Sequence, residues 1–394
     1  MRNGQMTRVA SSVVKELKFS RLTTSLLHLA LAGLAALAPS CATTGAEGQG
    51  DLNLPTTGVG PFRKLGVEEV AGIAPFVFDD RTALYREPAV LAPEDPARID
   101  SPAILYAVAR RAKADVIVRT RADDGRAFYG TSGDFGKTPP VVLAADAPWE
   151  GPSLAGPFVI RVRAEILLYY SAQGGIGMAR SSDGLSFQKV AGPIFSRDPA
   201  STWETTEVRA PSVYALADGR LRMLYASGSS IGEAESTDGI HFTRVDPDPS
   251  TAAIEPVLGP AAPAPPGSLL PNERPPFDTG GVGDPCAATR ITPDGRFHVR
   301  VLYTGTDDTG ATAIGFAARY GETGPLLRQT RAAPVYSVGA KEAAPALFEL
   351  PGGSYLYVQQ DRRVDAMLTY TAIAGAFAPG GVTLPTPAPF PDSP

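Results

Sequence analysis

The sequence predicts an all-β protein, a five-bladed β-propeller whose blades are four-stranded antiparallel sheets. Two internal repeats and the composition lead to this prediction. Gly 41 and Pro 38 together form about a fifth of the 394 residues, which is typical of many short strands joined by tight turns. A stack of separate β-sandwich domains is the alternative architecture.

The first repeat is a nine-residue motif that ends in proline. It runs aromatic, acid, three variable residues, aliphatic, two variable residues, proline, and it occurs at 149–157, 203–211 and 277–285. Each proline precedes a short apolar strand, and Pro88 and Pro345 precede similar strands. Five such strands predict five blades within residues 61–378. Because the aromatic–acid pair recurs at equivalent places, we expect it to have a structural role.

The second repeat predicts the turn before the outer strand of a blade. Residues 182–190 (SDGLSFQKV) match residues 237–245 (TDGIHFTRV). The Asp-Gly pair supplies the positive φ of a tight turn, and the aromatic residue starts the next strand. Residues 62–65 (FRKL) resemble the end of this motif, which the last repeat near Phe377 lacks. We therefore expect residues 61–66 to supply the outer strand of the last blade and to close the ring.

The N-terminal region predicts export. Residues 1–40 combine a basic segment with an apolar stretch at 22–38, as a signal peptide does. Cys41 follows Ala38-Pro39-Ser40, which resembles a bacterial lipobox, so we expect a lipidated Cys41 and a flexible tether over 41–60. Ala42 then favours the outer membrane of a Gram-negative cell envelope. A plain signal peptide with an incidental cysteine is the alternative.

Charge and residue usage exclude several function classes. The net charge is -5 and the first forty residues are basic, so the rest of the chain is clearly acidic and is not expected to bind nucleic acid. The two cysteines and three histidines show no metal-ligand spacing. We expect neither a metal nor a cofactor, and any acid–base chemistry would use carboxylates. Residues 379–394 form a Pro-rich C-terminal tail.

The segments 208–228 (VRAPSVYALADGRLRMLYASG) and 231–245 (IGEAESTDGIHFTRV) resemble the five-bladed propellers of glycoside hydrolase families 43, 32 and 130. The resemblance implies carboxylates near the axis. Carried over by position, Glu87 would be the base or nucleophile and Glu207 the general acid, in a desolvated cleft beside Trp203, with Asp284 orienting water or substrate. Gly156 stands where the carboxylate of the second blade would be.

Charged residues that differ between repeats are the candidates for substrate binding. With Trp203, they are Arg86, Arg209, Lys341 and Glu342. Side chains of both charges around one pore mouth favour the binding of an oligosaccharide. The alternative is a solvated rim whose charged side chains pair with one another. The sequence thus predicts an exported lipoprotein that acts on or binds an oligosaccharide. The alternative is a non-catalytic surface lipoprotein that binds glycan or protein.

Lipidation at Cys41 can be tested directly. The Cys41→Ala variant lacks the thiol that would carry the lipid, so we expect it to leave the membrane fraction and become soluble. Fractionation of cells that express the two forms checks this. Unchanged membrane association of the variant would count against lipidation.

Overall fold

The computed structural model describes residues 62–64, 76–78, 82–94, 101–123, 125, 128, 138–269, 275–292, 295–329, 333–350, 353–363 and 366–379. The predicted signal peptide, Cys41, the tether and residues 380–394 of the tail lie outside these ranges. Within the described ranges, no helix is long and apolar enough to cross a membrane.

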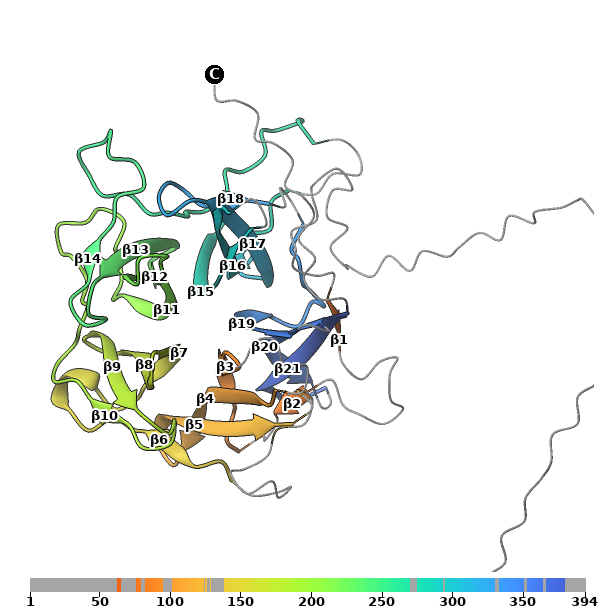
Figure 1. Ribbon diagram of the computed structural model, residues 1–394. Coiled ribbons are helices and arrows are strands. Elements are labelled where there is room, and N and C mark those ends of the chain that lie inside the picture. The colour runs from red at the N-terminus through yellow and green to blue at the C-terminus, as the bar shows by residue number, and fades with distance from the viewer. Residues whose placement is uncertain are drawn as a thin grey trace, which may run out of the picture. The chain divides into compact units, whose positions relative to one another are not determined.

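The described strands form five antiparallel sheets arranged radially around one axis (Figure 1). Each of blades 1 to 4 is a four-stranded meander whose first strand lies innermost. These strands are, for blade 1, β3 (Arg86–Leu91), β4 (Ala103–Arg111), β5 (Ala114–Ala122) and β6 (Val141–Leu143); for blade 2, β7 (Ala155–Val162), β8 (Glu165–Ala172), β9 (Gly175–Ser181) and β10 (Gln188–Lys189); for blade 3, β11 (Arg209–Ala215), β12 (Leu221–Ser227), β13 (Ser230–Ser236) and β14 (Thr243–Arg244); for blade 4, β15 (Gly281–Ile291), β16 (Phe297–Thr306), β17 (Thr312–Tyr320) and β18 (Leu327–Arg328). The propeller prediction is confirmed, and the stack of sandwiches is wrong.

Blade 5 is built from both ends of the propeller. It contains β19 (Ala343–Leu350), β20 (Gly353–Arg363) and β21 (Thr369–Pro379), and two short N-terminal strands, β1 (Arg63–Lys64) and β2 (Phe76–Phe78), pair with β21. Arg63 lies opposite Phe377, which confirms the expected closure for residues 63–64. Residues 61, 65 and 66 lie outside the described ranges. The pairing of β2 beside β1 was not foreseen.

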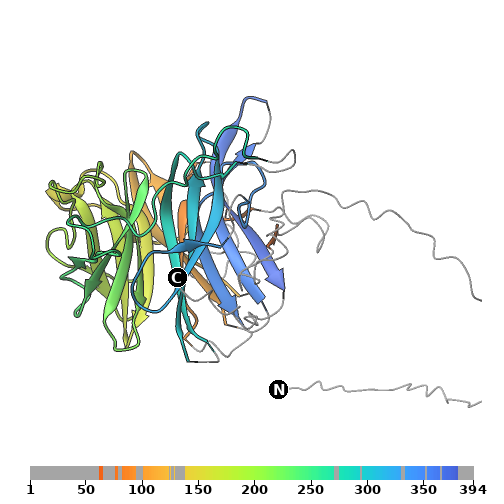
Figure 2. The same cartoon turned by 90° about the horizontal axis from the view of Figure 1, so that it is seen from above.

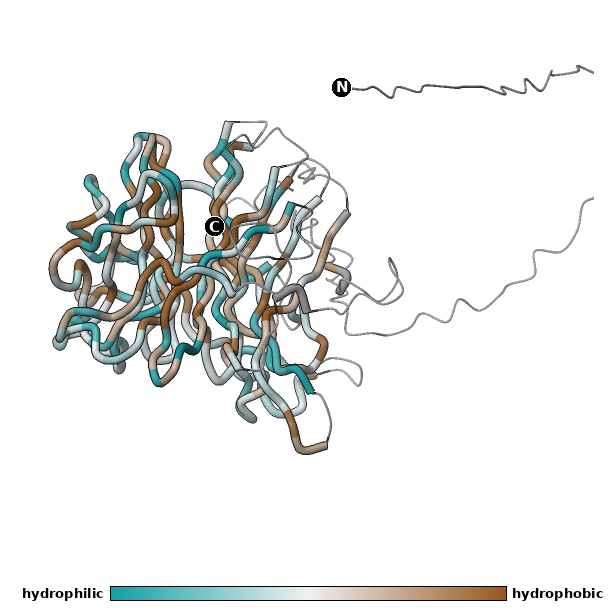
Figure 3. Tube along the Cα trace, turned by 90° about the horizontal axis from the view of Figure 1, so that it is seen from below, coloured by the Kyte–Doolittle hydropathy of each residue, from teal (hydrophilic) through white to brown (hydrophobic). Residues whose placement is uncertain are grey.

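The hydrophobic core is divided into five slabs, each between two neighbouring blades. One slab combines Leu105 and Val118 of blade 1 with Phe348 and Tyr357 of blade 5, and four similar clusters join the other neighbouring pairs. Figure 2 shows the strands lying alongside one another, and Figure 3 shows hydrophobic stretches along the Cα trace. Because every slab needs two blades, the apolar surface is fully buried only when the ring is closed.

The aromatic–acid pair fastens the loop before each inner strand to its own blade. In blade 3, Glu204 is completely buried, and it accepts hydrogen bonds from the Tyr225 hydroxyl at 2.8 Å and from Arg244 of the outer strand at 2.7 Å. Trp203 stacks on the Tyr225 ring. A buried carboxylate is tolerated only when it is paired and hydrogen-bonded, and this cluster meets both conditions.

The same cluster recurs in two other blades. Its members are Trp149, Glu150, Tyr170 and Lys189 in blade 2, where the 3-10 helix η1 (Pro148–Glu150) carries the acid, and Phe277, Asp278, Tyr303 and Arg328 in blade 4. The structural role predicted for the motif is confirmed. The tyrosine and the basic residue that complete each cluster were not recognised from the sequence.

Asp-Gly turns join neighbouring blades at three of the junctions. The Asp183 carboxylate accepts the N–H groups of Leu185 and Ser186, both at 2.8 Å. The hydroxyl of Tyr106, in the preceding blade, donates to the Gly184 carbonyl at 2.7 Å. A Cβ at residue 184 would lie 2.6 Å from this hydroxyl, so only glycine fits there. Similar bonds join blade 2 to blade 3 through Tyr169 and Gly239, and blade 5 to blade 1 through Tyr357 and Gly125.

The Arg244→Met variant tests the buried acid cluster. Removing the guanidinium leaves the Glu204 carboxylate buried without a cation, so we expect a loss of about 3–5 kcal/mol in the free energy of unfolding. Denaturant titration followed by circular dichroism measures it. The control is Arg121→Met, which removes the exposed partner of Asp123 and should cost less than about 1 kcal/mol. Equal losses in the two variants would contradict the assignment.

Candidate functional site

Each inner strand begins with the same strained bulge. The residue before the proline has a positive φ in all five blades: Glu87 (50°), Gly156 (48°), Ala210 (50°), Asp284 (45°) and Ala344 (50°). The pairing of inner and second strands shifts register at each of these places. A left-handed backbone costs a non-glycine residue about 1–3 kcal/mol, and such strain persists only where the surrounding structure enforces it. Here the flanking strands and the inter-blade packing do so.

The five inner strands enclose a channel along the propeller axis with a cavity volume of about 540 Å³. All five residues that precede the prolines line it. Since the inner strands are equivalent in the repeat and begin with these residues, the five residues surround one mouth of the channel. Only Glu87 and Asp284 among them carry a polar side chain.

Arg209 completes a small charged group at this mouth. Its guanidinium donates to the Asp284 carboxylate at 2.9 Å, and about half of the Arg209 side chain (46%) is exposed. The charges of both Asp284 and Arg209 influence the ionisation of Glu87, so blades 1, 3 and 4 contribute to a single electrostatic unit. Glu87, Arg209 and Asp284 are called the charged mouth below.

Glu87 is held in a partly buried position, with about a quarter (26%) of its side chain exposed. Its Oε2 accepts the N–H of Gly156 at 2.5 Å, and its Oε1 lies 3.4 Å from the Arg86 guanidinium. Desolvation by the surrounding channel wall raises the pKa of the Glu87 carboxyl, and the negative charge of Asp284 adds to this. The Gly156 N–H and the charges of Arg86 and Arg209 oppose the rise without cancelling it.

Glu87 also supplies a hydrogen-bond acceptor that blade 1 otherwise lacks at this place in the repeat. In blades 3 and 5, the N–H of the residue before the proline is accepted by a hydroxyl of the preceding blade, from Ser171 at 2.8 Å and Thr304 at 2.9 Å. In blade 1 the same register position is Val108, which has no hydroxyl. The Glu87 carboxylate therefore satisfies the Gly156 N–H instead, so one oxygen of this carboxyl is already engaged.

Two predicted site residues lie outside the channel wall. Glu207 is exposed and is absent from the lining, so the desolvated cleft expected around this carboxyl is not present. Trp203, expected to contact substrate, instead stacks on Tyr225 and donates its indole N–H to the Ile254 carbonyl at 3.0 Å. Both expectations failed because the loop before Pro211 turns its aromatic residue into the blade and Glu207 toward solvent.

Three further candidates for the site contact neighbouring residues and lie outside the channel lining. Lys341 is largely exposed and lies 3.7 Å from Asp361. Glu342 is completely buried and accepts the N–H groups of Val338 and Ala340 at 2.9 Å, so it holds a loop. Arg86 lies beside Glu87 and donates to Asp115 at 2.6 Å. None of the three lines the channel.

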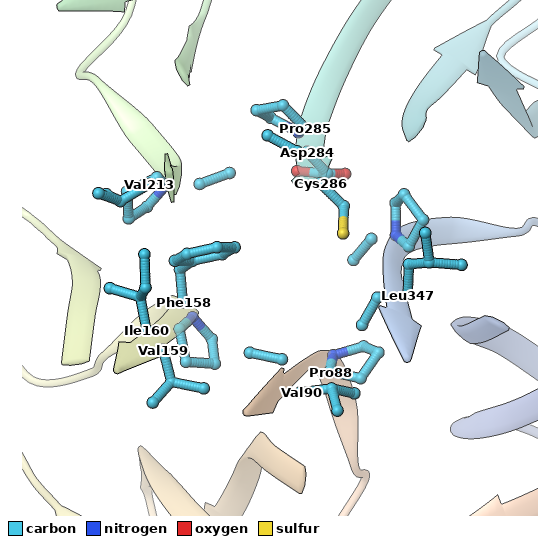
Figure 4. Close-up of a pocket in the computed structure, with 18 of the residues that line it drawn as sticks. Pro88, Val90, Phe158, Val159, Ile160, Val213, Asp284, Pro285, Cys286 and Leu347 are labelled. Carbon is cyan, nitrogen blue, oxygen red and sulfur yellow. The ribbon is translucent and has the colours of Figure 1, made fainter. Parts of the chain in front are cut away.

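The wall below the charged mouth is mostly apolar, which the charge-based search did not anticipate. Figure 4 shows Val90, Phe158, Val213 and Leu347 around the axis, with the Cys286 thiol among them. Burial raises the pKa of this thiol to about 11. The apolar residues that follow each proline in the sequence could have predicted this apolar wall. Among the described residues, no group of three or more His, Cys, Asp or Glu side chains could hold a metal ion.

Comparison with known proteins identifies the fold. No protein-family profile and no curated sequence matches the chain. A glycosyl hydrolase from Bacteroides ovatus matches with a TM-score of 0.56 at 14% identity, over 81% of this chain and 97% of that one. A candidate glycoside hydrolase, also from Bacteroides ovatus, gives 0.58 at 16% identity, over 83% and 99%.

A third match comes from work on the glycoside hydrolase family 130, whose mannoside phosphorylases are reported to include hydrolases that target β-1,2 mannosidic linkages in Candida mannan. Its TM-score is 0.52 at 14% identity, over 86% of this chain and 98% of that one. At such low identity the likeness establishes a shared five-bladed fold. It does not transfer an activity.

The raised pKa of Glu87 predicts a pH-dependent effect of Glu87→Gln. A carboxyl whose pKa is higher in the folded than in the unfolded chain destabilises the fold once it ionises, and this cost is absent below the unfolded pKa. Glutamine keeps an acceptor for the Gly156 N–H and carries no charge. We therefore expect Glu87→Gln to raise the melting temperature at pH 8 and to have little effect at pH 4.

Calorimetric scans at the two pH values measure this difference. The control is Asp284→Asn, which loses the ion pair with Arg209 and should not raise the melting temperature at pH 8. A melting temperature for Glu87→Gln that falls equally at both pH values would show that the Glu87 side chain stabilises the fold independently of its charge, and would contradict the raised pKa.

Proposed function

We propose that this protein binds a carbohydrate at the charged mouth of its axial channel. The observation that carries the proposal is the convergence of Glu87, Arg209 and Asp284, from three different blades, on one opening of the axial channel. Pockets with a few convergent polar groups on an apolar wall are typical ligand sites. The five-bladed fold shared with glycoside hydrolases supports carbohydrate as the ligand class.

The polar groups of the mouth suit a polyol. Two carboxyls can accept hydrogen bonds from sugar hydroxyls, and the exposed guanidinium of Arg209 can donate to them. Asp284 orients this guanidinium through the 2.9 Å contact, so the donor is held in place before a ligand arrives. Preorganised polar groups lower the entropic cost of binding. Lipid anchoring at Cys41 in the cell envelope is part of the same proposal, and would present this mouth outside the cytoplasm.

Binding without cleavage fits the described contacts best. Glu87 is engaged by the Gly156 N–H and Arg86, and Asp284 is paired with Arg209. Glu207 is exposed outside the channel wall, and Gly156 offers no carboxylate in blade 2. The acids that a cleavage reaction would use are therefore occupied, displaced or missing.

One observation favours a second candidate function, glycoside hydrolysis. The environments of Glu87 and Asp284 differ, because desolvation raises the pKa of the first while the second is paired with Arg209. Glycoside cleavage requires two carboxyl groups in different environments, one to donate a proton and one to act as base or nucleophile. In that case Glu87 would be the acid and Asp284 the base, whereas the resemblance by position implies Glu87 as base or nucleophile and Asp284 as the residue that orients water or substrate.

A binding and turnover screen tests both candidates. A panel of natural oligosaccharides is measured by glycan array and calorimetry, and aryl glycosides are measured for release of the aryl group. We expect binding without turnover. Arg209→Ala should weaken binding about tenfold or more, because a hydrogen bond to a charged group is lost, whereas Arg121→Ala on the exposed surface should not.

Two results would change the conclusion. Turnover that Glu87→Gln abolishes would establish the hydrolase in place of the binding protein. The carbohydrate site at this mouth would be ruled out if no carbohydrate in the panel binds. It would also be ruled out if Arg209→Ala leaves the binding unchanged.

A further inference from the structure

The channel below the charged mouth has the character of a site for an apolar group. Its wall is formed by the side chains that follow the prolines of the five inner strands, including Val90, Phe158, Ile160, Val213 and Leu347 (Figure 4). Several of these side chains are only half-buried, because the cavity leaves their inner surfaces uncovered. Filling the space with hydrocarbon would remove this apolar surface from water.

Several polar side chains of the wall already have partners within the protein. Ser171 accepts the Ala210 N–H at 2.8 Å. Near the far end, Glu349 receives both amino groups of the buried Arg300 at 2.8 and 2.7 Å. Among the described residues, the buried polar atoms without a partner all belong to side chains outside this wall. The side chains of the channel interior are therefore mainly apolar.

The dimensions fit a single narrow chain. About six residues of each inner strand line the cavity, and at roughly 3.3 Å per residue they span about 20 Å. A volume of about 540 Å³ spread over this length leaves a long, narrow space. It lies within the range of about 300–1,000 Å³ typical of sites for small molecules.

We propose that the ligand is an amphiphile: a sugar head group that binds the charged mouth, joined to one alkyl or aryl group that enters the axial channel. This inference rests on the proposed function, and it adds the class of the aglycone. The charged mouth would orient the head, and the apolar wall would select for the tail. A glycoside with a hydrocarbon aglycone is the simplest such molecule.

Cys286 provides a reporter inside the channel. Its thiol lies in the wall, and Cys41 is the sequence's other cysteine. In a full-length Cys41→Ala protein, the rate of Cys286 modification by N-ethylmaleimide therefore reports access to the channel. An occupied channel should protect the thiol. A ligand held only at the surface of the mouth should leave the interior thiol less protected, and by an amount that does not depend on tail length.

The experiment uses n-alkyl β-glucosides with tails of two to ten carbons, below their micelle concentrations, together with glucose and the matching n-alkanols. Calorimetry measures affinity, and thiol modification measures occupancy. We expect the affinity of the glucosides to rise roughly threefold to fourfold per added methylene until the channel is full. Protection of Cys286 should rise in parallel.

A bulky substitution in the wall provides the matched comparison. Val90→Phe should flatten the dependence on tail length, because the added ring occupies the channel. Val141→Phe makes the same change at an exposed position of β6 and should leave that dependence unchanged. Leu347→Phe, from blade 5, replaces Val90→Phe if circular dichroism shows that the first variant does not fold.

The outcomes separate this inference from the proposed function. If free oligosaccharides bind in an Arg209-dependent way but tail length changes neither affinity nor thiol protection, the amphiphile is overturned and the carbohydrate site stands. If alkanols bind as tightly as the glucosides and Arg209→Ala has no effect, the carbohydrate site is overturned, and the amphiphile with it.

Discussion

The fold depends on hydrophobic cores that are shared between neighbouring blades. Each of the five buried clusters takes side chains from two blades, so a blade without its neighbours would expose an apolar face. All of these apolar faces are buried only when blade 5 meets blade 1. There Tyr357 donates to the Gly125 carbonyl, and β1 pairs with β21. Closure is therefore the condition on which the stability of every blade depends.

Buried charged side chains add a second constraint to this packing, because each of them needs a specific partner. The acids Glu150, Glu204 and Asp278 could be buried only because a tyrosine and a basic side chain converge on each of them. Between blades 3 and 4, Arg319 contacts the buried Glu233 at 2.5 Å. Such pairs add little net stability compared with apolar residues. A misplaced blade 4, however, would separate Arg319 from both Glu233 and Tyr214 of blade 3.

The site is a consequence of the same framework. The strained residue before each proline lines the axis in every blade, and the ring supplies the rigidity that this backbone needs. Five equivalent positions thus surround one mouth, and four different residue types occupy them in blades of the same architecture. In this chain two of the five, Glu87 and Asp284, are charged, while the wall beneath them is apolar.

The sequence by itself determined the fold, the number of blades, the closing strand and the structural role of the aromatic–acid motif, because all four follow from local patterns that repeat along the chain. Of the residues proposed for the site, Glu87, Arg209 and Asp284 line the channel, and their part in binding stays a prediction. Only the tertiary structure decided that Glu207 and Trp203 lie away from the channel and that Glu342 is buried. The direction of a side chain on an irregular loop depends on contacts with distant residues such as Tyr225 and Ile254, which no local pattern encodes.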